Sequence, residues 1–235
     1  MQLDKIIWTE QAYRDYLAYL STLSEESMRI FNQKLIPDTP HLFGIRTPKL
    51  REVAKQIAKG DAEGFLRLSK GGYHEELIVE GLVMAHLPCD YPNLLRCMRY
   101  FAGKIYNWAI CDTVSFKRVK QFLPEFWLDA DSFLESRNPW AQRFGLGNLM
   151  QFYLTDDYID GVLSKTESIH SDFYYVQMMQ GWLIATAVAK QRDKTIDFLK
   201  HTTLETTAYN MAIKKARESL RISAEDKALL LCLKR

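Results

Sequence analysis

The sequence lacks the motifs of several function classes. Its four cysteines stand singly, without CxxC spacing, and its five histidines show no HxxxH or HExxH pattern. The glycine-containing stretch "KGGYHEE", which begins at Lys70, has neither Walker A nor GxGxxG spacing and is typical of a turn between helices. We therefore expect no metal, no cofactor and no nucleotide-dependent chemistry.

The sequence also has no apolar run long enough to span a bilayer. The most apolar stretch, Tyr174 to Ala189, falls short of the roughly 20 residues that a membrane helix needs, and it contains Gln177 and Gln180. We interpret it as a buried helix. Met1 is followed by polar and charged residues rather than by a secretory leader, so we expect a cytoplasmic protein with reduced thiols.

A large excess of charge is absent as well. The chain carries 31 Lys and Arg against 29 Asp and Glu, which gives a net charge of +2 at pH 7. Bulk charge thus gives weak support for a polyanionic partner, and a nucleic-acid site must depend on where the cations lie. Hydrophobic residues make up 47% and charged residues 26%, as in an ordinary folded chain. We predict one domain over residues 1–235.

Helical periodicity, in contrast, is nearly continuous, whereas strand signals are scarce. The start signals of helices include Thr47 before Pro48, Asn138 before Pro139, and Ser223. The pattern predicts helices over residues 9–22, 24–35, 47–59, 61–69, 73–86, 91–103, 106–119, 120–135 (broken), 138–153, 156–167, 172–189, 191–200, 204–219 and 223–233.

The more apolar helices recur at a regular interval, with starts near residues 73, 106, 138, 172 and 204. A pair of antiparallel helices cannot bury its apolar face alone, so neighbouring pairs must stack. We predict an all-α fold, a right-handed superhelix (α-solenoid) of HEAT-like helical repeats. The second helices would line the concave side and bring "NWAICD", "NPWAQRFG" and "YYVQMMQGW" to one groove.

The helix predicted over residues 106–119 carries the first candidate functional residues. Lys104, Trp108 and Asp112 are spaced i, i+4 and i+8, which keeps them roughly on one face. The alternative is a solvated lysine and aspartate on either side of a core tryptophan.

The next two apolar helices each carry one further candidate. Arg143 is the sole charge between residues 139 and 156, so it is either a buried ion-pair partner or a cation that faces a ligand. Trp182 follows Gly181 in the most apolar helix, where a core position is the alternative to a functional one.

The order of these motifs resembles that of the AlkD-like DNA alkylation repair proteins, which are HEAT-like-repeat DNA glycosylases. The resemblance begins at "FGIRTPKLREVAK" (residues 43–55) and continues through "NWAICD" and "NPWAQRFG". It includes "DFYYVQMMQGW" and ends with "YNMAIKKARESLRIS" (residues 209–223), so it covers nearly all of the chain beyond the first helices.

The resemblance implies a particular set of site residues. In glycosylases of this family, the working site contains an aspartate four residues after a tryptophan, an arginine one repeat later, and a tryptophan after a small residue on the following repeat. The positions that match are Trp108, Asp112, Arg143 and Trp182. The sequence departs from some active relatives at Asn107, where they carry a second aromatic residue.

The implied activity is hydrolysis of the N-glycosidic bond of purines alkylated at N3 or N7, in duplex DNA, by a monomer. Asp112 would stabilise positive charge on the deoxyribose, Trp108 and Trp182 would lie beside the sugar, and Arg143 would hold a phosphate. The cations expected to bind DNA are Lys104, Lys117, Arg143, Lys190 and Lys214. The alternative is a non-catalytic repeat protein that binds unusual DNA structures or a protein partner in the same groove.

Overall fold

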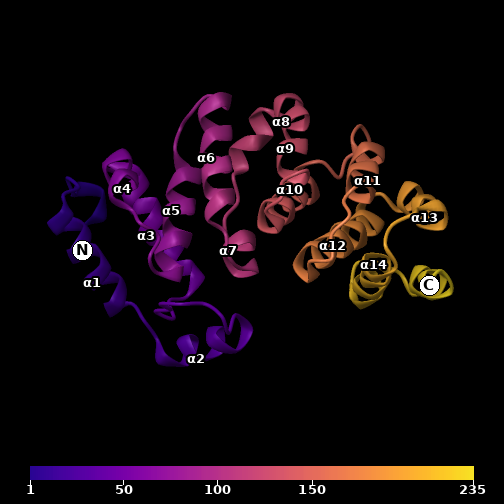
Figure 1. Ribbon diagram of the computed structural model, residues 1–235, viewed down its shortest axis with the longest axis horizontal. Coiled ribbons are helices and arrows are strands. Elements are labelled where there is room, and N and C mark those ends of the chain that lie inside the picture. The colour runs from indigo at the N-terminus through magenta and orange to yellow at the C-terminus, as the bar shows by residue number, and fades with distance from the viewer. The chain divides into compact units, whose positions relative to one another are not determined.

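The computed structural model describes all 235 residues and consists of helices joined by short connections (Figure 1). The elements are η1 (Leu3–Lys5), α1 (Glu10–Thr22), α2 (Glu26–Leu35), α3 (Thr47–Lys59), α4 (Ala62–Leu68), α5 (His74–His86), α6 (Tyr91–Lys104), α7 (Trp108–Thr113), η2 (Lys117–Gln121), α8 (Leu123–Asp129), α9 (Asp131–Leu134), α10 (Pro139–Phe152), α11 (Ile159–Glu167), α12 (Tyr174–Lys190), α13 (Arg192–His201), α14 (Thr206–Glu218) and α15 (Ala224–Cys232). The predicted all-α fold of helical repeats is confirmed. The apolar helices that were predicted to recur at a regular interval each begin within two residues of the predicted start. They are α5, α7, α10, α12 and α14.

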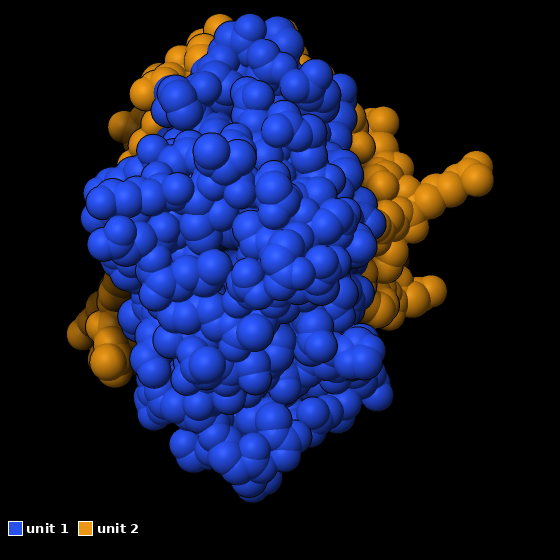
Figure 2. Space-filling model, turned by 90° about the vertical axis from the view of Figure 1, so that its left-hand side faces the viewer, with its two compact units in different colours: residues 1–118 blue, residues 119–235 orange.

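The chain divides into two compact units, Met1–Arg118 (unit 1) and Val119–Arg235 (unit 2), which Figure 2 distinguishes by colour. In unit 1, α5 packs against α3, α4, α6 and α7. In unit 2, α12 packs against α10, α13 and α14, while α15 covers α14. Each unit is therefore a stack of helical repeats with its own apolar core. The single domain over residues 1–235 stays a prediction.

Helix α5 is buried along most of its length, and its buried residues include carboxylates. Glu75 accepts hydrogen bonds from the backbone N–H groups of Phe43, Gly44 and Ile45 at 2.9, 2.6 and 3.2 Å. Gly44 has φ +83°, and a Cβ there would lie 2.5 Å from the backbone nitrogen of Arg29. Only glycine fits this turn, which brings three N–H groups to one carboxylate.

Two further carboxylates anchor the chain on either side of α5. Glu76 accepts from the Tyr13 hydroxyl and from the backbone N–H groups of Gly71 and Tyr73 at 2.8 and 3.1 Å. The Tyr73 contact satisfies the backbone N–H of the N-cap residue at the start of α5. Glu80 accepts from Lys104 Nζ at 2.7 Å through both of its oxygens. These bonds join α5 to α1, to the turn before it and to the end of α6.

The structure corrects one predicted helix. The range 106–119 contains α7 and part of η2 rather than a single helix, and Lys104 ends α6. The prediction that Lys104, Trp108 and Asp112 share one helical face was therefore wrong. The cause is Asn107, whose backbone is extended (φ −150°, ψ 166°) and whose side chain accepts a hydrogen bond from Ile110 N. Asn107 is an N-cap that starts a new helix at Trp108.

The other start signals gave mixed results. Asn138 and Ser223 are N-caps, as predicted, because their side chains accept hydrogen bonds from Trp140 N and Asp226 N. Thr47 was wrongly taken as a cap, since it is the first helical residue of α3. No helix combines the length and the apolarity that a membrane crossing requires.

All four cysteines are free thiols. Cys111 is buried in α7, Cys89 and Cys97 are half-buried, and Cys232 is exposed. Burial raises the pKa of the Cys89 thiol and of the Cys97 thiol.

We expect Glu75→Gln to lower the free energy of unfolding by about 1.5–3 kcal/mol, because three N–H groups lose a charged acceptor. Glu52→Gln, on the exposed side of α3, is the matched control and should change stability by less than about 0.5 kcal/mol. Chemical denaturation measures both. Equal stabilities of the two variants would contradict the anchoring role of Glu75.

Candidate active site

Trp108 and Asp112 lie one turn apart on α7 and both line a cavity of about 380 Å³ within unit 1. Asp112 is exposed and Trp108 is half-buried. The remaining wall comes from α2, α3, α5 and the connection between α2 and α3. Its apolar members are Met28, Phe31, Leu35, Ile36, Ile45, Leu50 and Ile78. The arrangement sets a carboxylate and an indole beside a largely apolar wall.

Trp108 is held by a contact with α2. Its Nε1 lies 3.4 Å from the carbonyl oxygen of Leu35 and donates a hydrogen bond to it. The indole therefore has a defined orientation at the cavity, since one edge is tied to the neighbouring helix.

A buried polar network fixes the start of α7. Asn107 Nδ2 donates to Thr39 Oγ1 at 2.9 Å and lies 3.4 Å from His74 Nδ1. Its Oδ1 is occupied by the Ile110 N–H, so the amide nitrogen must face His74, whose Nδ1 accepts. A neutral imidazole meets this requirement, and burial lowers the pKa of His74 to about 4.

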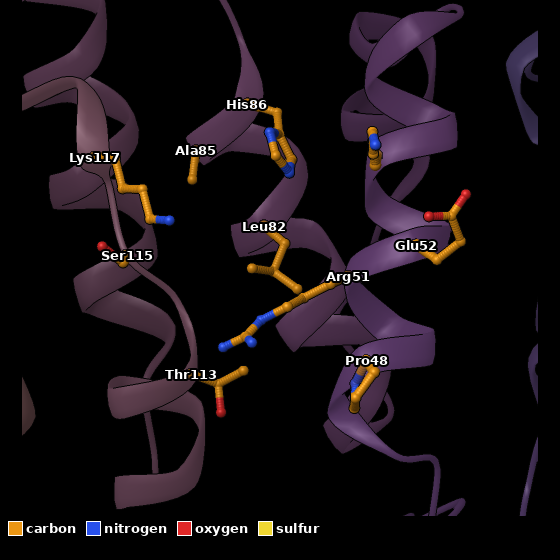
Figure 3. A pocket seen from close by; sticks show the side chains of 10 residues that line it. Pro48, Arg51, Glu52, Leu82, Ala85, His86, Thr113, Ser115 and Lys117 are labelled. Atoms are coloured by element: carbon orange, nitrogen blue, oxygen red, sulfur yellow. The ribbon is translucent and has the colours of Figure 1, made fainter.

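A second cavity adjoins the first, because Arg51 and Thr113 line both. Its volume is about 530 Å³, and its lining includes the predicted DNA-binding Lys117 (Figure 3). The sequence reasoning missed Arg51, Lys55 and His86 in this cavity. The one signal for them is the spacing of Arg51 and Lys55, which are four residues apart on α3.

In unit 2, Arg143 is only 3% exposed. Its Nη1 donates to the backbone carbonyl of Tyr175 at 2.7 Å, which ties α10 to α12. The aromatic rings near this bond pack together, since the Trp140 ring lies 5.1 Å from that of Phe173 and 5.2 Å from that of Tyr175. Arg143 thus has a structural partner, and its contact with a phosphate stays a prediction.

Trp182 is on the surface of unit 2 rather than in its core. The side chain on α12 is 41% exposed and borders a hollow of about 190 Å³, together with Lys215 and Arg221. Gly181 precedes it, and a Cβ there would lie 2.9 Å from Met211 Cβ. The small residue before Trp182 therefore allows α12 to approach α14 closely.

The predicted DNA-binding lysines differ in their surroundings. The charge of Lys104 is paired with Glu80 at 2.7 Å. Lys190 is exposed at the end of α12, and exposed Lys214 borders a cavity of about 490 Å³ on α14. No group of three or more His, Cys, Asp or Glu side chains is arranged to hold a metal ion.

The fold and the cavity together define a class, namely a helical-repeat protein that presents a carboxylate and a tryptophan beside an apolar wall. A family model described as "DNA alkylation repair enzyme" matches residues 17–220. The chain belongs to this family, which confirms the resemblance drawn from its motifs. A search of curated proteins gives no match. Family membership supports a role in DNA repair, with DNA as the partner.

We expect the free energy of unfolding to fall as the pH is lowered from 6.5 to 4, because His74 is buried in its neutral form. The pKa of His74 is about 4 in the folded chain and 6.5 in the unfolded chain. Below pH 6.5 the unfolded chain therefore binds a proton that the folded chain does not. The contribution is complete above pH 6.5 and is lost progressively toward pH 4, by up to about 3 kcal/mol.

Thermal unfolding of His74→Gln across this pH range measures that loss, with the exposed His170→Gln as the matched control. His74→Gln should show a shallower acid dependence than the parent, whereas His170→Gln should follow the parent. The same acid dependence in all three proteins would contradict a buried neutral His74.

We expect Arg143→Ala to lower the free energy of unfolding by about 1.5–3 kcal/mol, because the Tyr175 carbonyl loses a charged donor. Arg217→Ala, an exposed arginine of α14, is the control and should be close to neutral. Denaturant titrations and the salt dependence of DNA binding are measured on both. A stable Arg143→Ala protein with a reduced salt slope would instead assign the side chain to a phosphate.

Proposed function

We propose that the protein is a DNA glycosylase that hydrolyses the N-glycosidic bond of purines alkylated at N3 or N7 in duplex DNA. The observation that carries the proposal is the position of Asp112 and Trp108 on one turn of α7, at a cavity with apolar walls. Membership of a DNA alkylation repair family supports the substrate class.

The chemistry requires a group that stabilises a cationic sugar. A purine alkylated at N3 or N7 is already cationic, so it leaves with the electron pair of the bond to C1′. Positive charge then builds on the deoxyribose, and a fixed carboxylate in a partly dehydrated place stabilises that charge as it develops. Asp112 is that carboxylate in the proposal. Water adds to C1′, and its proton passes to Asp112 or to solvent.

The apolar wall strengthens this interaction. Met28, Phe31 and Leu35 of α2 border the cavity that Asp112 and Trp108 also line. Side chains of this kind exclude water, and Coulombic attraction between a carboxylate and a cation grows as the local dielectric constant falls. The indole of Trp108 adds an electron-rich face that attracts developing positive charge.

The other members of the predicted site enter the proposal in supporting roles. Trp182 would shield the sugar in the same way as Trp108, and Arg143 would position the lesion strand. No metal ion is needed, because alkylation has already made the base a good leaving group and Asp112 supplies the counter-charge.

We expect Asp112→Asn to keep the fold and the DNA affinity while losing about 100- to 1000-fold in the rate of base release. Asparagine is nearly isosteric, so it removes a charge whose attraction is much stronger in the transition state than in the ground state. The measurement is release of 7-methylguanine or 3-methyladenine from alkylated duplex DNA in the presence of EDTA. Asp15→Asn, an exposed aspartate of α1, is the matched control.

Four outcomes bear on this proposal. Loss of release in Asp112→Asn alone supports it, whereas release at the parent rate removes Asp112 from the chemistry. A parent protein that binds alkylated DNA without releasing any base would favour the non-catalytic alternative. Abolition of release by EDTA in the parent would contradict the metal-independent mechanism.

A further inference from the structure

The second cavity of unit 1, called here the Arg51 cavity, lies between α3, the end of α5 and the segment after α7. Its lining residues are Pro48, Arg51, Glu52, Lys55, Leu82, Ala85, His86, Thr113, Ser115 and Lys117. Figure 3 shows the side chains of Arg51 and Lys117 reaching into this space from opposite walls, while Glu52 points away from it. Cationic ends therefore converge from elements far apart in the sequence.

The charge of the Arg51 cavity is not balanced by the protein. Arg51, Lys55 and Lys117 form no ion pair and no side-chain hydrogen bond, and the one carboxylate, Glu52, accepts only from Gln56 at 3.3 Å. Other cations of unit 1 do have a carboxylate partner. Lys49 of α3, for example, lies 3.0 Å from Glu25, and Lys104 of α6 lies 2.7 Å from Glu80.

His86 gives a separate indication that these charges meet. The pKa of His86 is lowered, first by burial and then by the positive charges of Lys55 and Lys117. The imidazole thus lies within the field of both lysines. Like charges held this close repel one another, and an anion that enters the cavity relieves the repulsion.

We propose that the Arg51 cavity binds a phosphate group of the DNA backbone. A guanidinium fork, two ammonium groups and the hydroxyl of Thr113 supply the donors that a tetrahedral phosphate accepts. The apolar lining consists of Leu82 and Ala85 beside Pro48, which offer no group that could read a base edge. Contact here is therefore independent of sequence.

The position of this cavity links it to the candidate active site. Arg51 and Thr113 border both cavities, and Thr113 directly follows Asp112 in α7. A strand whose phosphate occupies the Arg51 cavity passes beside Asp112, so this contact positions one strand for the reaction. The inference rests on the proposed function only in taking DNA as the source of the phosphate.

The test compares two double variants of the full chain that lose the same charge. Lys55→Ala/Lys117→Ala removes the two ammonium groups of the cavity, whereas Lys59→Ala/Arg67→Ala removes two exposed cations of α3 and α4 outside both cavities. Binding of an undamaged DNA duplex is measured by fluorescence anisotropy over a range of salt concentrations. No base release is needed.

We expect the cavity variant to lose about 0.9 in the slope of log K against log salt, which corresponds to one phosphate contact. The control variant should keep the slope of the parent. Equal slopes in the two variants, with folding verified by circular dichroism, would overturn the proposal. If the parent releases base but the two variants have the same salt slope, the Arg51 cavity proposal fails and the glycosylase proposal stands. If the salt slopes differ but the parent releases no base, the glycosylase proposal fails and the phosphate site stands.

A second readout follows the His86 imidazole by NMR. The duplex should raise the pKa of His86 in the parent protein, because the phosphate cancels the field of the lysines. An unchanged pKa at saturating duplex would contradict phosphate binding in this cavity. The same measurement is made with inorganic phosphate in place of the duplex. If phosphate raises the pKa of His86 at concentrations as low as those of the duplex, the cavity is a site for a small anion instead.

Discussion

The buried carboxylates of α5 determine how unit 1 is assembled. A carboxylate removed from water costs several kcal/mol unless hydrogen bonds and cations compensate it. Glu75 therefore requires the turn at residues 43–45, Glu76 requires the turn before α5, and Glu80 requires Lys104. The first bond places the start of α3 and the last places the end of α6. Because α7 follows α6 after a short connection, the cavity beside Asp112 depends on the same bonds.

Much of the fold was predictable because helical periodicity survives in every repeat. The starts of the recurring apolar helices were correct to within two residues. The end of α6 was predicted to within one residue. The extended backbone at Asn107, which separates Lys104 from the helical face of Trp108 and Asp112, was not predicted. Whether a polar residue caps a new helix or continues an old one depends on its partners, here Thr39 and His74, which are distant in the sequence.

The candidate site was likewise predictable only in part from the sequence. The motif "NWAICD" indicated Trp108 and Asp112, which the structure places at one cavity. The sequence could not separate Lys104 from Lys117, because both are lysines on polar positions near this motif. Only packing shows that the first is paired with a buried carboxylate while the second faces two other cations. The role of a lysine is thus set by its neighbours in space, which periodicity does not reveal.

The burial of the thiols affects how the protein itself withstands alkylating agents. Alkylating agents attack sulfur more readily than they attack DNA bases, and the reactive form of cysteine is the thiolate. Cys111 is enclosed beside Asp112, and burial raises the pKa of the Cys89 and Cys97 thiols, which lowers the fraction of reactive thiolate at both. Cys232, at the end of α15, is the exposed exception. An electrophile therefore meets sulfur first at the periphery, where an added alkyl group leaves the packing around α7 intact.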